Sequence, residues 1–258
     1  MPHAAGLWYE WHGPEDGEVL ILSAGLGGSA HYWAPNLAAL AERYRVLLYD
    51  HRGTGRSDPL PPGPTSVDAM ARDLLDLMDA LEVARGSLLG HALGGLIGLA
   101  LASAAPDRLD KLVVVNGWAR LDPYTARCFD LRLELLRARG AEAYLQAQPM
   151  FLYPAAWISE RLAALDAHAS RQLADFPPPE TIEARVAAAR AFELPADVTA
   201  EVLVLACADD MLVPAHCSKI LASELGRARL ETLTWGGHGC NVTDPATFNR
   251  IILEFLGS

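Results

Sequence analysis

Short runs of apolar residues recur along the chain and alternate with segments of helical periodicity. The runs are nearly continuous and rich in Val, Leu and Ile, which is typical of strands in a parallel sheet that helices cover on both faces. In Leu7–His12 apolar and polar residues alternate instead, so we expect this strand at an antiparallel edge of the sheet. The other predicted strands are Val19–Ser23, Arg45–Asp50, Ser87–Leu89, Lys111–Asn116, Val202–Cys207 and Leu230–Leu233.

Two segments between these strands have the apolar spacing of a helix. The apolar residues of Met70–Glu82 fall on one helical face, and Leu96–Ala105 is apolar nearly all round, as a buried helix would be. The alternation stops after Asn116, and the next segment has helical character, several prolines and no strand signal. The pattern predicts an α/β fold with a core formed by residues 1–116 and 199–258 and an inserted helical cap formed by residues 117–198.

Composition limits the classes of partner. The chain has 258 residues, 51% of them hydrophobic, and a formal net charge of -11. Without a run of Lys and Arg, neither nucleic acid nor an anionic membrane surface is an expected partner. The sequence lacks the roughly 20-residue apolar stretch of a membrane span and the pattern of a signal peptide. We expect a cytoplasmic monomer or homodimer that acts on a small molecule.

The four cysteines show no paired framework and no CxxC spacing. This usage is typical of reduced thiols in a cytosol and does not favour a zinc site. We therefore expect neither a metal nor an organic cofactor.

The stretch GHALGG, Gly90–Gly95, carries the clearest chemical signal. It has the form of the GxSxG turn between a strand and a helix, in which the central Ser is a nucleophile, but Ala92 stands in the place of that Ser. Leu93 follows it and is predicted to offer its backbone N–H to a developing oxyanion. The residue before the nucleophile normally points away from the pocket, so we do not expect His91 to replace the nucleophile.

The glycine-rich loop in LILSAGLGGSA has two interpretations. Gly25, Gly27 and Ala30, together with Asp50, match the dinucleotide-binding pattern GxGxxA and its ribose-binding acid. Alternatively, the loop directs backbone N–H groups toward an oxyanion, with Leu26 as the donor. The segment DHRGTGRSDP and the second glycine-rich turn favour the oxyanion loop, because a dinucleotide fold has no need for either.

An acid and a histidine follow in the C-terminal part of the chain. Asp210 comes after the strand Val202–Cys207, and His238 lies between glycines in WGGHGCNVTDP. Each residue alone is more often structural than catalytic. However, the positions 92, 210 and 238 reproduce the order of nucleophile, acid and base in a hydrolase triad. We therefore predict that Asp210 orients His238 as a proton shuttle.

These motifs together resemble the α/β-hydrolase fold family over nearly the whole chain. More narrowly, the stretches VNGW, QPMFLYPAAW and GGHGCNVTDP are similar to hydrolases of bacterial pyrimidine breakdown. The resemblance implies hydrolysis of a C–N bond in a carbamate or in 3-aminoacrylate, with release of ammonia. It also implies that Asp210 is the acid, that His238 is the base and that Ala92 is native. Candidate pocket residues are Gly25, Trp118 and Tyr153, and candidate partners of a substrate carboxylate are Arg52, Arg120 and Arg127.

Ala92 leaves three hypotheses open. The protein is an enzyme whose reaction needs no covalent step, a serine esterase or C–C hydrolase whose nucleophile was replaced, or a protein that only binds a small molecule. The implied substrates favour the first hypothesis. A carbamate breaks down once its nitrogen is protonated, and an aminoacrylate tautomerises to an imine that adds water, so a proton shuttle and an oxyanion cradle are sufficient.

Overall fold

Eight strands form one sheet in the computed structural model, which describes residues 2–258. The sheet has the order β1–β2–β4–β3–β5–β6–β7–β8, and every pair from β4 to β8 is parallel. At its centre, Leu22 pairs with Leu48 on one side and with Leu89 on the other. The strands are β1 (His3–Ala4), β2 (Leu7–His12), β3 (Val19–Ser23), β4 (Arg45–Tyr49), β5 (Gly86–His91), β6 (Leu109–Val115), β7 (Glu201–Cys207) and β8 (Ala228–Leu233).

The antiparallel strand predicted at the sheet edge lies one position further in. β2 pairs antiparallel with β4, and the two-residue strand β1 pairs antiparallel with β2 beyond it. A strand of two residues is too short to produce an alternating pattern, so the sequence did not predict β1.

Helices cover both faces of the sheet, each over its own apolar cluster. One cluster joins Leu74, Leu96 and Leu221, and the other joins Leu40 and Ile252. The first face is covered by α2 (Val67–Ala80), α3 (Leu93–Ala104) and α8 (Ala215–Glu224), and the second by α1 (Ala34–Ala41) and α10 (Pro245–Leu256). The short elements are η1 (Ala30–Trp33), η2 (Pro106–Arg108) and α9 (Cys240–Thr243). The α/β class with a mostly parallel sheet is confirmed.

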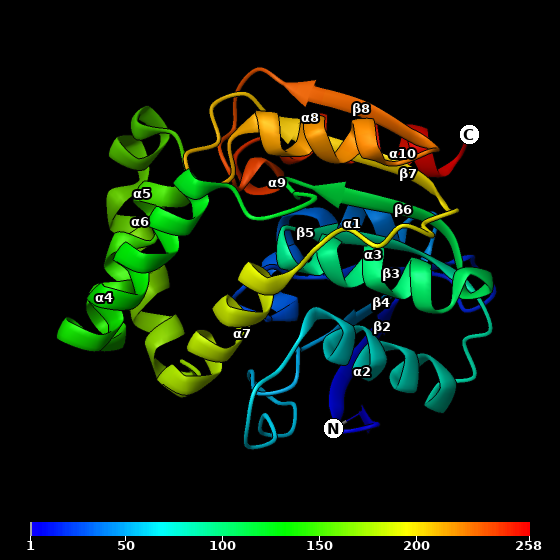
Figure 1. Cartoon of the computed structure of the whole chain (residues 1–258), viewed down its shortest axis with the longest axis horizontal. Helices are drawn as coiled ribbons and strands as arrows, with labels where there is room; N and C mark the ends of the chain where they lie inside the picture. The colour runs from blue at the N-terminus through cyan, green and yellow to red at the C-terminus, as the bar shows by residue number, and fades with distance from the viewer. Residues whose placement is uncertain (1) are drawn as a thin grey trace.

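Four helices come between β6 and β7 in the chain. They are α4 (Pro123–Ala147), α5 (Pro149–Leu152), α6 (Ala155–Ala174) and α7 (Pro179–Ala191). Figure 1 shows α4, α5 and α6 beside the end of the sheet to which the arrows of β6 and β8 point. The carboxyl ends of the strands meet at that end, and ligands of open α/β sheets bind there. We refer to residues 117–198 as the helical insertion; their role as a cap stays a prediction.

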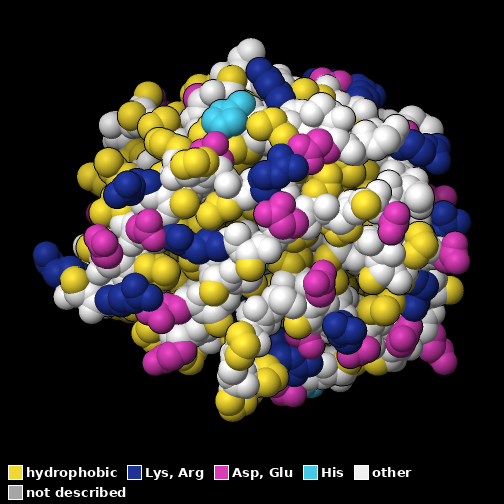
Figure 2. All heavy atoms as spheres, in the orientation of Figure 1, with side chains coloured by type: hydrophobic (Ala, Val, Ile, Leu, Met, Phe, Trp, Pro, Cys, Tyr) yellow, Lys and Arg dark blue, Asp and Glu magenta, His cyan; other side chains and the backbone are white. Residues whose placement is uncertain are grey.

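Charge is mixed on the surface. In the view of Figure 2, basic and acidic side chains are interspersed with apolar ones over the whole visible face. Among residues 2–258, none of the helices combines the length and the apolar character that crossing a bilayer requires.

Candidate active site

The turn between β5 and α3 holds Ala92 in a strained conformation. Its φ is +46° and its ψ is −112°, a region that L-residues rarely adopt. Two glycines make the turn possible: a Cβ on Gly90 would lie 2.4 Å from the carbonyl oxygen of Gly94, and a Cβ on Gly94 would lie 2.2 Å from that of Ser23. Helix α3 begins at Leu93, so the turn has the strand–residue–helix arrangement that the sequence predicted.

Replacing Ala92 with glycine is expected to stabilise the protein. Relief of the strain at positive φ outweighs the entropy that a glycine adds to the unfolded chain, for a net gain of about 1–2 kcal/mol in the free energy of unfolding. Chemical denaturation measures this gain. The matched control is Ala163→Gly on exposed helix α6, which should lose about 0.5–1 kcal/mol. An equal loss of stability in both variants would show that Ala92 is not strained.

His238 and Asp210 form a buried pair. His238 Nδ1 lies 2.7 Å from Asp210 Oδ2, and both side chains are almost fully buried. The other carboxylate oxygen of Asp210 accepts from the backbone N–H groups of Leu212 at 2.7 Å and Val213 at 2.9 Å. A carboxylate accepts but cannot donate, so Nδ1 carries the proton in this contact and Nε2 is the nitrogen left to accept another proton.

Two side chains fix the backbone of His238. His91 Nε2 lies 2.8 Å from the carbonyl oxygen of His238, and Asn116 Nδ2 donates to the same oxygen at 2.9 Å. Asn116 also accepts from the N–H of Cys207 at the end of β7. Burial, and then the nearby His238, hold the pKa of His91 well below its usual range. His91 is therefore neutral, and its Nε2 contacts the backbone of His238.

Stability is expected to fall in mild acid. Burial lowers the pKa of both His91 and His51 in the folded state, so below about pH 6.5 the unfolded chain binds protons that the folded chain does not. The free energy of unfolding should drop by about 1 kcal/mol per histidine between about pH 7 and pH 5.5. Denaturation at both pH values, repeated with His91→Gln, should show a drop smaller by about 1 kcal/mol in the variant. The control His31→Gln, at an exposed histidine, should keep the full drop, and a drop of the same size in all three would refute this explanation.

The predicted oxyanion donors lie beside this turn. The N–H of Leu93 is at the N-terminus of α3, where the helix dipole favours negative charge. Gly25 packs against the turn, because a Cβ there would lie 2.9 Å from His91 Nδ1. Among the described residues, neither the N–H of Leu26 nor that of Leu93 has a hydrogen-bond acceptor. Their role as oxyanion donors stays a prediction.

Asp50 has a structural role that removes it from the dinucleotide pattern. Its buried carboxylate accepts from the N–H of Ala30 at 2.8 Å and from Arg56 Nε at 2.9 Å. The acid that would bind a ribose thus anchors the start of η1 and the following loop. The oxyanion-loop interpretation explains the same glycines without requiring Asp50 to be accessible.

The candidate pocket residues are placed differently. The loop of His238 contacts α5: Gly239 donates its N–H to the carbonyl oxygen of Leu152 at 2.9 Å, and a Cβ on Gly239 would lie 2.6 Å from the Tyr153 ring. Trp118 is buried in the same apolar cluster as Ala92, and its ring meets Phe129 edge-on. Tyr153 is therefore adjacent to the histidine loop, whereas Trp118, near the start of the insertion, packs in the buried apolar cluster.

Two candidate partners of a substrate carboxylate and one group of possible metal ligands have protein partners. Arg52 binds Asp73 at 2.9 Å, and Arg120 binds Glu224 at 2.8 Å, which leaves neither free for a substrate carboxylate. One group of donor atoms within 4.8 Å of one another could hold a metal ion; it consists of Asp122, His216 and Cys217. Its His216 Nε2 already pairs with Asp122 at 2.9 Å.

Two supporting residues, Asn116 and Tyr32, were not predicted from the sequence. Asn116 fixes His238, and Tyr32 donates to Asn241 Oδ1 at 2.6 Å while its ring lies 4.8 Å from His91. Asn116 also has a φ of +51°. The only local signal was the NG pair at the end of a strand, which indicates a turn and not a contact with a residue far along the chain.

Known proteins resemble this chain in sequence. The sequence profile of the alpha/beta hydrolase fold matches residues 18–245. A protein of Caulobacter segnis named "Putative carbamate hydrolase RutD" is 54% identical over 257 residues, which are 97% of this chain and 96% of that protein. A protein of the same name from Azorhizobium caulinodans is 44% identical and covers 100% of this chain and 98% of its own length.

Solved structures resemble it as well. A hydrolase from Pseudomonas aeruginosa aligns with a TM-score of 0.87 at 33% identity, over 98% of this chain and 94% of its own. The enol-lactonase from Burkholderia xenovorans aligns with a TM-score of 0.88 at 28% identity, over 98% of this chain and 96% of its own. The chain therefore belongs to the α/β-hydrolase fold family and, within it, to the RutD hydrolases.

Proposed function

We propose that the protein hydrolyses carbamate and releases ammonia during the breakdown of pyrimidines, with 3-aminoacrylate as a second candidate substrate. The names of relatives that are 44–54% identical support the carbamate. The observation that carries the proposal is the buried contact of 2.7 Å between His238 Nδ1 and Asp210, next to a turn without a nucleophile. Such a pair can move a proton but cannot form an acyl-enzyme with Ala92.

In the proposed reaction, a water molecule occupies the space that a serine hydroxyl would fill beside Ala92. Its oxygen bonds to the carbamate carbon, and its proton passes to His238 Nε2. The N–H groups of Leu26 and Leu93 hold the oxyanion. His238 then transfers the proton to the carbamate nitrogen, the C–N bond breaks with its electron pair on nitrogen, and ammonia and bicarbonate leave.

Typical rate enhancements are large enough for the His238–Asp210 pair and the oxyanion donors to catalyse the reaction. General acid–base catalysis typically contributes about 10²–10⁴-fold, and one oxyanion donor about 10²–10³-fold. Enzymes that have lost their triad still retain roughly 10³–10⁴-fold over water. Carbamate decays without a catalyst, so an acceleration of this order gives a useful enzyme.

The test is the initial rate of ammonia release from freshly dissolved carbamate and from freshly generated 3-aminoacrylate. Wild type, the His238→Ala variant and buffer are compared side by side. Acceleration by wild type that the variant loses supports the proposal. Equal rates in wild type and buffer would refute it.

The serine-hydrolase hypothesis keeps one observation in its favour, because Ala92 adopts the strained conformation in which this fold presents a nucleophilic serine. The variant Ala92→Ser separates the two. A replaced nucleophile predicts that the variant hydrolyses simple activated esters with burst kinetics. Our proposal predicts instead that the wild-type protein, which has Ala92, already accelerates carbamate breakdown.

We also propose that the helical insertion acts as a cap. The insertion contacts the loops that carry both members of the pair: Thr125 Oγ1 donates to the carbonyl oxygen of Leu212 at 2.9 Å, and the Leu152 carbonyl accepts from Gly239. Movement of these helices would therefore displace Asp210 and His238.

A further inference from the structure

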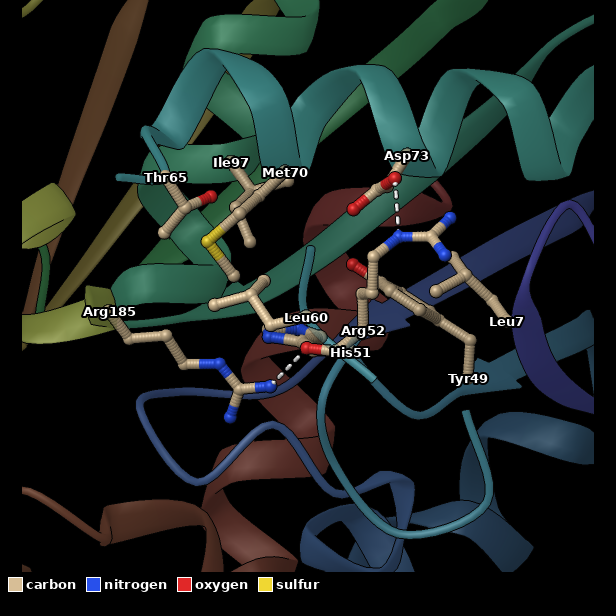
Figure 3. Close-up of a pocket in the computed structure, with 10 residues that line it drawn as sticks. All are labelled: Leu7, Tyr49, His51, Arg52, Leu60, Thr65, Met70, Asp73, Ile97 and Arg185. Carbon is tan, nitrogen blue, oxygen red and sulfur yellow. Dashed lines mark hydrogen bonds and ion pairs between the residues drawn. The ribbon is translucent and has the colours of Figure 1, made fainter. Parts of the chain in front are cut away.

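Arg185 on α7 is fully buried, and among the described residues it has no carboxylate partner. Its guanidinium donates to three backbone carbonyl oxygens instead. Nη1 lies 3.2 Å from the oxygen of Leu26 and 3.3 Å from that of Gly27, and Nη2 lies 2.7 Å from that of Arg52. Figure 3 shows the guanidinium beside His51 with the bond to Arg52. A single side chain of the insertion thus holds the proposed oxyanion loop and the loop that follows β4.

A buried cation is a costly way to join two segments. Removing an ion from water costs several kcal/mol, and apolar residues of similar volume often give equal or greater stability. Burial lowers the pKa of Arg185 to about 10, which reflects this cost. The guanidinium fixes the orientation of the carbonyl groups, because its donors form a planar array.

The oxyanion loop has few other constraints. Gly25, Gly27 and Gly28 have no side chains to pack, and a Cβ on Gly27 would meet nothing within 4 Å. Its other bonds include a turn from the N–H of Gly28 to the oxygen of Gly25 at 3.0 Å, a contact of Thr54 Oγ1 with the oxygen of Gly27 at 3.2 Å, and the N–H of His51, which donates to the oxygen of Gly28 at 2.8 Å. The guanidinium lies directly on Gly28, where a Cβ would be 2.7 Å from Nη1.

Direct binding of substrate by Arg185 does not fit this geometry. Both Nη atoms contact carbonyl groups, and the buried Nε has no hydrogen-bond partner among the described residues. The cavity beside the side chain, between α2 and the loop that follows β4, has a volume of about 10 Å³. That volume is about the size needed for one water molecule, and it cannot admit a carboxylate substrate. Arg185 therefore acts on the loop and not on the substrate.

We propose that Arg185 is a positioning residue that couples the helical insertion to the oxyanion loop. While α7 is seated, Arg185 holds the carbonyl groups of Leu26 and Gly27, and this contact keeps the loop in the direction in which the N–H of Leu26, part of the preceding peptide group, serves the substrate oxygen. When α7 moves away, the loop loses this direction and the oxyanion donor is lost. This inference rests on the proposed function for the role of Leu26, but the contact itself can be tested without turnover.

The first measurement is amide hydrogen exchange at Gly28 and at His51, whose N–H donates to the oxygen of Gly28 at 2.8 Å. Arg185→Met removes the charge and nearly preserves the length of the side chain. We expect exchange at both amides to rise at least about tenfold in this variant, with little change in the melting temperature. Arg190→Met on the same helix is the control, because its guanidinium binds Ala126 and Asp130 away from the loop.

The second measurement is the kcat and KM of carbamate breakdown. A lost oxyanion donor lowers kcat by up to about 10²–10³-fold and changes KM little. Arg185→Lys, which keeps the charge but not the planar array of donors, should be intermediate in both measurements, and it replaces Arg185→Met if that variant does not fold.

Unchanged exchange at Gly28 and His51 overturns the inference, whatever the activity. A wild type without activity refutes the proposed function and leaves the exchange result to decide the role of Arg185.

Discussion

His238→Ala is expected to slow the release of ammonia from carbamate by about 10²–10⁴-fold. The variant loses Nε2, the only nitrogen of the buried pair that is free to take a proton, because Nδ1 is bound to Asp210 at 2.7 Å. Asp210→Asn tests the same pair from the other side. Its amide group can donate to the histidine and select the wrong tautomer, a change that costs about 10⁴-fold in a serine-protease triad.

The control for both variants is His3→Ala, which removes an exposed histidine from the short edge strand β1. Its rate should equal that of wild type. Denaturation of all variants separates lost catalysis from lost folding, since Asp210 also accepts from two backbone N–H groups. A His238→Ala protein that is folded and as fast as wild type would rule out the proton shuttle.

Gly94→Ala should cost the protein most of its stability. The new Cβ would lie 2.2 Å from the carbonyl oxygen of Ser23 and 2.5 Å from that of Ala24, and both atoms are backbone at the end of the central strand β3. Neither can move without disturbing the sheet. We expect a loss above about 4 kcal/mol, out of the about 5–15 kcal/mol that native proteins typically have.

Circular dichroism during denaturation measures this loss, and failure to obtain soluble protein is its extreme form. Gly226→Ala is the matched control, because a Cβ at that loop position meets nothing within 4 Å. Its free energy of unfolding should stay within about 0.5 kcal/mol of wild type. A Gly94→Ala protein with wild-type stability would show that the turn can repack.

The boundaries of elements were predicted less well than their existence. β3 has the predicted bounds Val19–Ser23, whereas α3 begins at Leu93 and not at the predicted Leu96. Gly94 and Gly95 have low helix propensity, so the sequence pattern places the start of the helix after them. In the folded chain they are helical, because the absence of a Cβ lets α3 pack directly on β3 and β6, where a Cβ on Gly95 would lie 2.7 Å from a Val114 methyl group.

The sequence by itself determined the α/β fold and the order of position 92, Asp210 and His238, because these depend on local periodicity and on motifs of a few residues. Tertiary structure alone decided what holds these groups in place. Asn116 reaches His238 across 122 positions, Arg185 reaches Leu26 across 159, and Tyr32 reaches Asn241 across 209. Such contacts leave no periodic pattern, since they exist only after the sheet has brought the ends of its strands to one edge.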